Sequence, residues 1–102
     1  GEYEWDKSME EQNSEEFRRA YVCMVKKVQA AYEGVQLILV IGDRLTEDYA
    51  ASIMEIAAHF DLPYVNFIGD GERLPKCKTV HPDAVGQRYL AEKIYSTCRN
   101  YL

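Results

Sequence analysis

The sequence predicts an α/β fold in which a small parallel sheet of two or three strands packs with three main helices. Two short apolar runs, residues 35–41 and 64–68, are rich in β-branched and aromatic residues, as buried strands are. Segments with apolar residues at helical spacing precede, separate and follow these runs. Because a helix between two strands carries the chain back to the same end of the sheet, the alternation favours parallel pairing.

The first helix is predicted after a polar, acidic opening. Asn13 and Glu16 have the spacing of a capping box, which is typical of a helix start. Gly34 follows the segment at a position where a left-handed residue commonly ends a helix. The residues between them that share the apolar stripe are Phe17, Tyr21, Met24, Val25, Val28, Ala31 and Tyr32.

A β-α-β unit is predicted from residue 35 to residue 68. The first run is nearly uninterrupted, so we expect a strand buried on both faces that ends at Gly42. Thr46 is a plausible N-cap for the next helix, and Pro63 follows its end. The expected apolar positions of that helix are Ala50, Ile53, Met54, Ala57 and Phe60.

A polar connection of residues 69–80 follows the second strand. It is long by the usual standard, and it lies at the carboxyl end of the strand, where open α/β sheets bind ligands. The last helix is predicted to begin at Pro82-Asp83, and Gly86 inside its first turns indicates close packing against a neighbouring segment. Its expected stripe is Leu90, Ile94, Cys98 and Tyr101.

Length and charge limit the organisation and the partners. A chain of 102 residues suits one modest core, so we predict an acidic N-terminal extension at residues 1–13 and a single α/β domain at residues 14–102. The net charge is −5, and the first sixteen residues hold seven acids and one lysine. Because nucleic-acid binding needs a concentrated basic surface, this composition argues against it.

Cysteine usage, hydropathy and sheet edges complete the predictions on partners. Cys23, Cys77 and Cys98 are widely spaced and form no zinc pattern, so we predict no metal and no cofactor. No apolar run is long enough to predict a membrane span. The sequence does not begin with Met, and a two-stranded sheet has two edges to protect, so we expect the remainder of a longer chain or a homodimer partner.

His81 is the residue that most suggests chemistry. It lies between the polar connection and the last helix, beside the predicted strand ends, where an imidazole can reach a crevice and titrate near neutrality. These properties suit a general base. The alternative is a partly exposed junction residue whose ring helps to order the start of the helix.

The string from Thr79 to Ala91 resembles the final motif of SGNH/GDSL-type hydrolases, in which Asp-x-x-His-Pro-(Asn/Asp)-x-x-Gly leads into the last helix. Gly86, Ala91 and Ile94 fall in register with that motif. The order of helices and strands resembles the C-terminal half of the family's domain, an SGNH-like half domain. The resemblance implies hydrolysis of a small ester or carbohydrate ester by an esterase or deacetylase, with His81 as general base.

The same comparison implies an incomplete catalytic set. In that family a serine near the first strand is the nucleophile, and an aspartate three residues before the histidine orients the imidazole. Lys78 stands in the place of that aspartate, and a cation cannot accept the imidazole N–H bond. Asp70 or Asp83 is an alternative orienting group. Residues 37–45 imitate the nucleophile string, but Arg44 replaces its serine.

Two functions therefore stay open. The first is a C-terminal SGNH-hydrolase-like module that is not competent alone, with His81 as base and Lys78 and Asp83 as candidate substrate-binding residues. The second is a non-catalytic α/β binding or interaction module derived from that fold. A flavodoxin-like or receiver-like signalling domain would need an acidic cluster after an early strand, which Asp43 alone does not supply.

Overall fold

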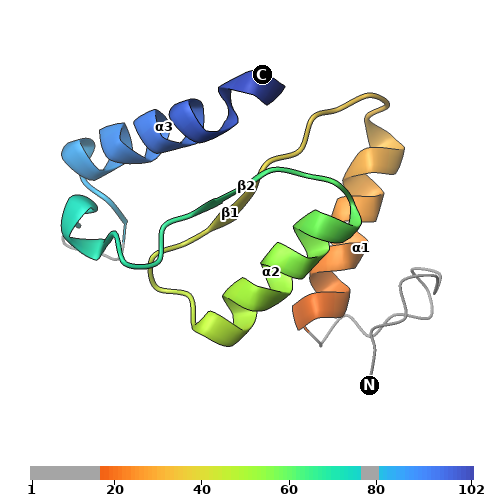
Figure 1. The fold of residues 1–102 in the computed structure, drawn as a ribbon, viewed down its shortest axis with the longest axis horizontal. Helices are drawn as coiled ribbons and strands as arrows, with labels where there is room; N and C mark the ends of the chain where they lie inside the picture. Colours follow the sequence, from red (N-terminus) through yellow and green to blue (C-terminus); the bar gives the residue numbers. More distant parts are fainter. Residues whose placement is uncertain (1–16, 77–80) are drawn as a thin grey trace. The chain divides into compact units, whose positions relative to one another are not determined.

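The computed structural model describes residues 17–76 and 81–102 (Figure 1). The described residues fall into two compact units, which divide between Val35 and Gln36. In the first unit, helix α1 spans Phe17–Ala31. Gly34 then has φ of +76°, which confirms the predicted left-handed position. Met24 and Tyr32 are exposed, so the apolar stripe of α1 is narrower than its spacing predicted. The predicted capping box and acidic extension lie outside the described residues.

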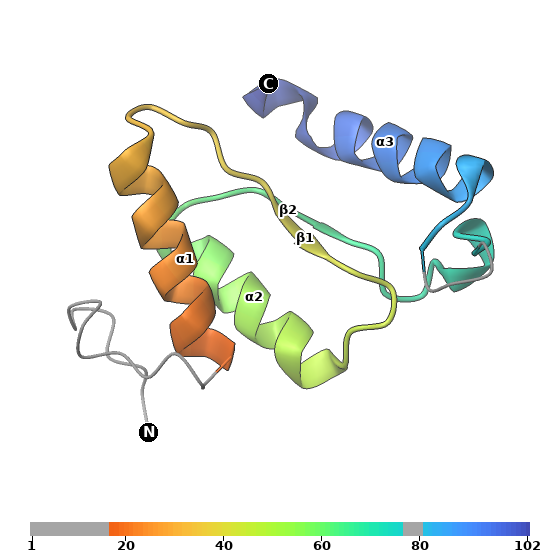
Figure 2. The ribbon, with the colours of Figure 1, turned by 180° about the vertical axis from the view of Figure 1, so that it is seen from behind.

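The second unit contains the sheet (Figures 1 and 2). Strand β1 (Leu39–Ile41) and strand β2 (Tyr64–Asn66) run parallel, with Val40 opposite Val65. Helix α2 (Glu47–His59) connects them, and helix α3 (Ala84–Cys98) ends the main fold. Two short 3-10 turns, η2 (Gly71–Arg73) and η3 (Arg99–Tyr101), precede and follow α3. The predicted α/β fold, with three helices and a small parallel sheet, is confirmed.

The strands are shorter than predicted, and β1 is not buried on both faces. Leu39 and Ile41 are buried, whereas Val40 between them is 43% exposed. Helices α2 and α3 lie on opposite sides of the strands, and α3 packs against β2 (Figure 2). Paired residues of parallel strands point to the same face, so Val40 lies on the face where α3 covers Val65. Helix α3 does not cover Val40 itself, which stays exposed.

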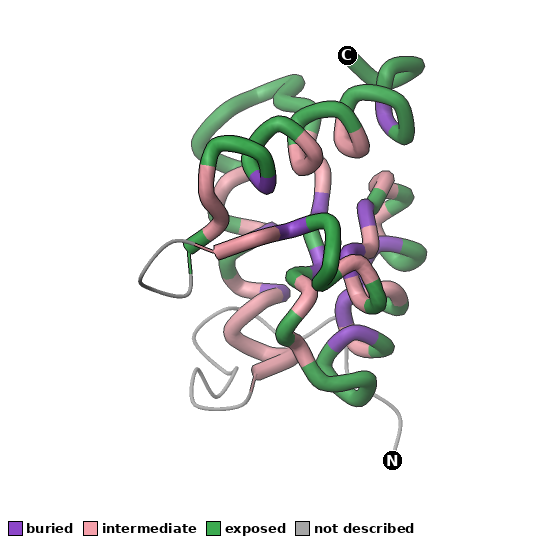
Figure 3. The backbone as a smooth tube through the Cα atoms, turned by 90° about the vertical axis from the view of Figure 1, so that its left-hand side faces the viewer, coloured by how far each residue is buried: buried purple, intermediate pink, exposed green. Residues whose placement is uncertain are grey.

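The core of the second unit has one part on the side of α3 and another on α2. Figure 3 shows how buried and exposed residues alternate along the backbone. On the side of α3, a cluster of Val65, Phe67, Leu74 and Cys98 is joined by the partly buried Ile38, Tyr89, Leu90 and Ile94. Helix α2 buries Ala50, Ile53, Ile56 and Ala57. Tyr101 was wrongly assigned to the stripe of the last helix: it lies in η3, beyond the end of α3, and is 50% exposed.

The start of α3 is fixed by a cap and by close packing. Asp83 has an extended backbone, and its Oδ1 accepts a hydrogen bond from the Gly86 N–H at 3.0 Å, as an N-cap does. A Cβ on Gly86 would lie 2.8 Å from the Pro82 Cβ and 3.1 Å from the Pro75 carbonyl oxygen. The close approach predicted for Gly86 is therefore confirmed, and its neighbours are Pro75 and Pro82.

None of the helices within the described ranges has the length and apolarity to cross a membrane.

Candidate functional site

The candidate site lies at the carboxyl edge of the sheet, where both parallel strands end. Asp43 follows β1, and Asp70 and Gly71 follow β2. A Cβ on Gly71 would lie 3.9 Å from Asp43 Oδ2, which is ordinary contact distance. The turns after the two strands therefore lie near each other, and they bring acidic side chains to one edge, as parallel pairing requires.

Asp43 is paired with a lysine from the connection that leads to α3. The Lys76 Nζ lies 3.2 Å from each of the two Asp43 carboxylate oxygens. The two side chains are 24% and 17% exposed, so the pair is partly shielded from water. Shielding of this kind makes an ion pair stronger than one on an open surface.

Lys76 lies beside the segment that carries His81. Lys76 forms an antiparallel bridge with Pro82, the residue after His81. The next residue, Asp83, donates its backbone N–H to the Pro75 carbonyl oxygen at 2.8 Å. The structure therefore brings the exposed His81 to the carboxyl edge of the sheet, close along the backbone to the residue that pairs with Asp43.

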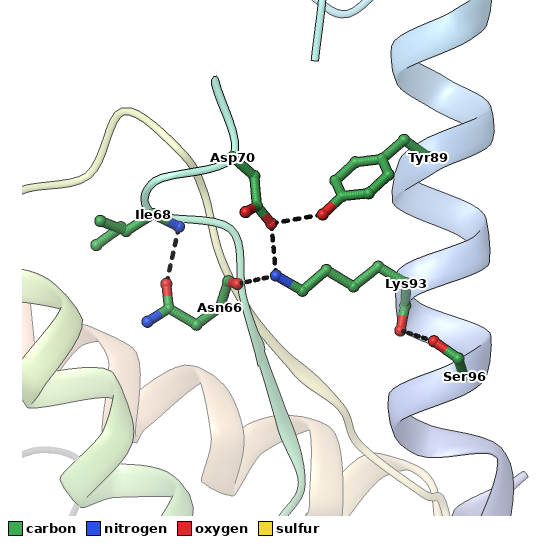
Figure 4. A network of polar contacts seen from close by, with 6 residues as sticks. All are labelled: Asn66, Ile68, Asp70, Tyr89, Lys93 and Ser96. Carbon is green, nitrogen blue, oxygen red and sulfur yellow. Dashed lines mark hydrogen bonds and ion pairs between the residues drawn. The ribbon is translucent and has the colours of Figure 1, made fainter. Parts of the chain in front are cut away.

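A second polar network joins the end of β2 to α3 (Figure 4). Asp70 Oδ2 accepts hydrogen bonds from the Tyr89 hydroxyl at 2.8 Å and from the Lys93 Nζ at 2.5 Å. Lys93 also donates to the Asn66 carbonyl oxygen at 2.6 Å, and the Asn66 side chain accepts from the Ile68 N–H at 2.9 Å. This network ties two turns of α3 to the chain that leaves β2.

The network shifts the acid–base properties of its members. Hydrogen bonds from Lys93 and then Tyr89 lower the pKa of the Asp70 carboxyl below its ordinary value. The same bond to Asp70 raises the pKa of the Tyr89 hydroxyl. Arg73 lies over the Tyr89 ring, 5.7 Å from its centroid, and so adds a positive charge beside the pair. Asp70 is therefore held as an anion.

The two carboxylates considered as orienting groups each have a structural role. Asp70 is bound by α3 through Tyr89 and Lys93, and Asp83 caps α3 through its Oδ1. Lys78, the other candidate substrate-binding residue, lies outside the described residues. In residues 17–76 and 81–102, no three His, Cys, Asp or Glu side chains gather closely enough to hold a metal ion.

Sequence reasoning missed Asn66, Tyr89 and Lys93 as polar anchors. One signal was present: Asn66 is a polar residue inside an otherwise apolar strand run, and Tyr89 and Lys93 are four residues apart on one helix. The pairing of Asp43 with Lys76 had no such signal, because the two residues are distant in the sequence and share no motif.

A comparison with protein families identifies the family of the chain. A family model described as GDSL-like Lipase/Acylhydrolase matches residues 1–98, nearly the whole chain. The chain therefore belongs to the GDSL-like lipase/acylhydrolase family, and the resemblance found in the motif around His81 is confirmed at the level of the family. No curated protein and no solved structure matches the chain significantly.

Proposed function

We propose that this chain is the C-terminal module of an SGNH/GDSL-type ester hydrolase, an esterase or a carbohydrate deacetylase. In this proposal His81 is the general base, and the serine nucleophile comes from outside residues 1–102. The observation that carries the proposal is the anchoring of the residues after His81 at the carboxyl edge of the sheet, through the bridge of Lys76 to Pro82 and the bond from Asp83 to Pro75. Ligands of open α/β sheets bind at that edge.

The chemistry assigned to His81 is proton transfer. Its neutral imidazole takes the proton of the serine hydroxyl as the oxygen attacks the ester carbonyl, and it then returns that proton to the leaving alcohol. The imidazole needs an acceptor for its second ring nitrogen so that it keeps the correct tautomer. Lys78, in the family position of that acceptor, has only donors. We therefore propose that the chain alone is not competent.

The ligand in this proposal is a small ester or an acylated carbohydrate. A shallow hollow lined by Ala84, Val85 and Arg88 lies on the first turn of α3, close in sequence to His81. The hollow has a volume of about 160 Å³ and is mostly apolar. A hollow of this volume suits a short acyl group better than a long chain. Lys78 and Asp83 stay candidates for contact with the substrate.

A second candidate is a non-catalytic binding or interaction module derived from the same fold. It is favoured by Lys78 at the place of the orienting aspartate, and by the structural partners of Asp70 and Asp83. Its partner would be the remainder of a longer chain or a second copy of this one. Activity measurements separate the two candidates, because only the first requires His81 for chemistry.

The test is hydrolysis of p-nitrophenyl acetate, measured for this chain and for the longest natural protein that contains it. The variant is His81→Ala, and the matched control is His59→Ala, the other of the two histidines, which is exposed near the end of α2. For the longer protein, loss of the general base should lower kcat by about 10²–10⁴-fold, while His59→Ala leaves it unchanged. The chain alone should show no rate that depends on His81.

Two results would contradict this proposal. If the longer protein hydrolyses the ester equally well with His81→Ala, His81 is not its base, and the binding module becomes the better description. If the chain alone hydrolyses the ester and His81→Ala abolishes that rate, a nucleophile lies within residues 1–102 and the incomplete set is wrong.

A further inference from the structure

We propose that Asp43 is a positioning residue for His81, and that it acts through Lys76. The proposal rests on the function assigned above only where activity is concerned, because the placement of His81 can be measured without catalysis. The juxtaposition that carries it is a chain of three contacts: Asp43 to Lys76, Lys76 to Pro82, and Pro75 to Asp83.

The first contact anchors the connection to the sheet. Asp43 follows β1, which is fixed by its pairing with β2, and the Lys76 Nζ lies equally close to both of its carboxylate oxygens. Both side chains are partly buried, so solvent screens the pair less than an exposed one. Asp43 also lies near the turn at Gly71, since a Cβ added to that glycine would be 3.9 Å from Asp43 Oδ2.

The second and third contacts link the anchored Lys76 segment to the residues around His81. The backbone of residues 75–76 pairs with Pro82 and accepts the N–H of Asp83. The start of α3 then lies so close to Pro75 and Pro82 that position 86 has no room for a Cβ. His81 precedes this packed segment directly, so the segment that sets its backbone position depends on where Lys76 is held.

Removing the Asp43 charge should move His81 without unfolding the chain. Leu74 remains buried in the apolar cluster, and the bond from Asp83 to Pro75 involves backbone atoms only, so both survive the loss of the ion pair. The freed Lys76 would then leave the segment less well fixed at the sheet edge. A catalytic base displaced by about 1 Å costs an enzyme on the order of a hundredfold in rate, so small shifts matter.

The decisive experiment records the ring resonances of the two histidines by long-range ¹⁵N–¹H NMR, with His81→Ala used for assignment. In Asp43→Asn, we expect the His81 resonances to shift and broaden while those of His59 stay in place. The control is Asp61→Asn, a similar change at an exposed residue before β2, which should leave the His81 resonances at their wild-type positions. The double variant Asp43→Lys with Lys76→Asp reverses the pair and should return the His81 resonances toward wild type.

Activity gives an independent measurement. In the longer hydrolase, Asp43→Asn should lower kcat by about tenfold to a hundredfold with KM unchanged, because positioning rather than binding is lost. His81 resonances that stay in place in Asp43→Asn would overturn the inference, and so would a reversed pair that fails to restore them. If instead His81→Ala leaves ester hydrolysis intact, the proposed function fails, while the resonances still decide the role of Asp43.

Discussion

At the scale of single residues, close packing explains a glycine at a helical position where helix propensity disfavours it. Gly86 lies inside α3, where glycine costs about 1 kcal/mol relative to alanine. Its missing side chain allows the start of the helix to approach the Pro75 carbonyl oxygen and the Pro82 ring. The glycine therefore serves the junction that carries His81 rather than the helix itself.

This residue gives a prediction about stability. Gly86→Ala should lower the free energy of unfolding by up to about 2 kcal/mol, because overpacking costs about 1–3 kcal/mol and the gain in helix propensity offsets about 1 kcal/mol. Urea denaturation followed by circular dichroism measures the change. Gly42→Ala is the matched control, since a Cβ there has no atom within 4 Å and the backbone is not left-handed. A neutral or stabilising Gly86→Ala would show that the contacts with Pro75 and Pro82 relax freely.

At the scale of elements, α3 is attached to β2 by an apolar cluster and by a polar network. The cluster includes Phe67 and Cys98, both fully buried. The network fixes the charge of Lys93 between Asp70, the Asn66 carbonyl oxygen and the Phe67 ring, whose centroid is 5.0 Å away. Because both attachments use the same helix, α3 presents its first turn, and His81 before it, in one orientation toward the sheet edge.

The network predicts a dependence of stability on pH. The pKa of Asp70 is lowered in the folded chain, so its contribution is fully present above its ordinary value of 3.8 and is lost as the pH falls through the lower folded value. Asp70→Asn should therefore lower the urea midpoint near neutral pH, and the difference from wild type should shrink in acid. Urea titrations at about pH 7, 5 and 3 measure this, with Asp61→Asn as the control. A difference that stays constant across these pH values would contradict the role of the Asp70 charge.

At the scale of the whole molecule, the order of elements could be read from the sequence because it depends on local patterns. Apolar runs and helical spacing identified β1, α2, β2 and α3, and chain order alone brought His81 to the carboxyl edge. The burial of the first strand could not be read in this way, since Val40 is apolar yet exposed on the face where α3 covers Val65. The ion pair of Asp43 with Lys76 could not be predicted from the sequence either, because it forms only when two segments distant in the sequence come together.

The sheet predicts association with another chain segment or a second copy. Within the described residues, β1 and β2 form a sheet of two strands, and Val40 and Tyr64 are exposed large apolar side chains on them. We expect this chain to form a dimer in solution, and Val40→Lys to weaken it, because a charge disfavours strand addition at an edge. Light scattering coupled to gel filtration measures the mass of both proteins. A monomer at the highest soluble concentration of the wild-type chain would contradict the expectation.

The burial of Cys98 offers a way to follow the attachment of α3 to β2 over time. Its thiol is fully enclosed beneath the C-terminal end of α3, whereas that of Cys23 is only partly covered. An alkylating reagent therefore reaches Cys98 only while α3 is transiently released, so the alkylation rate under native conditions reports the free energy of that local opening. The protein thus carries an internal chemical probe of whether the helix that follows His81 is held or released.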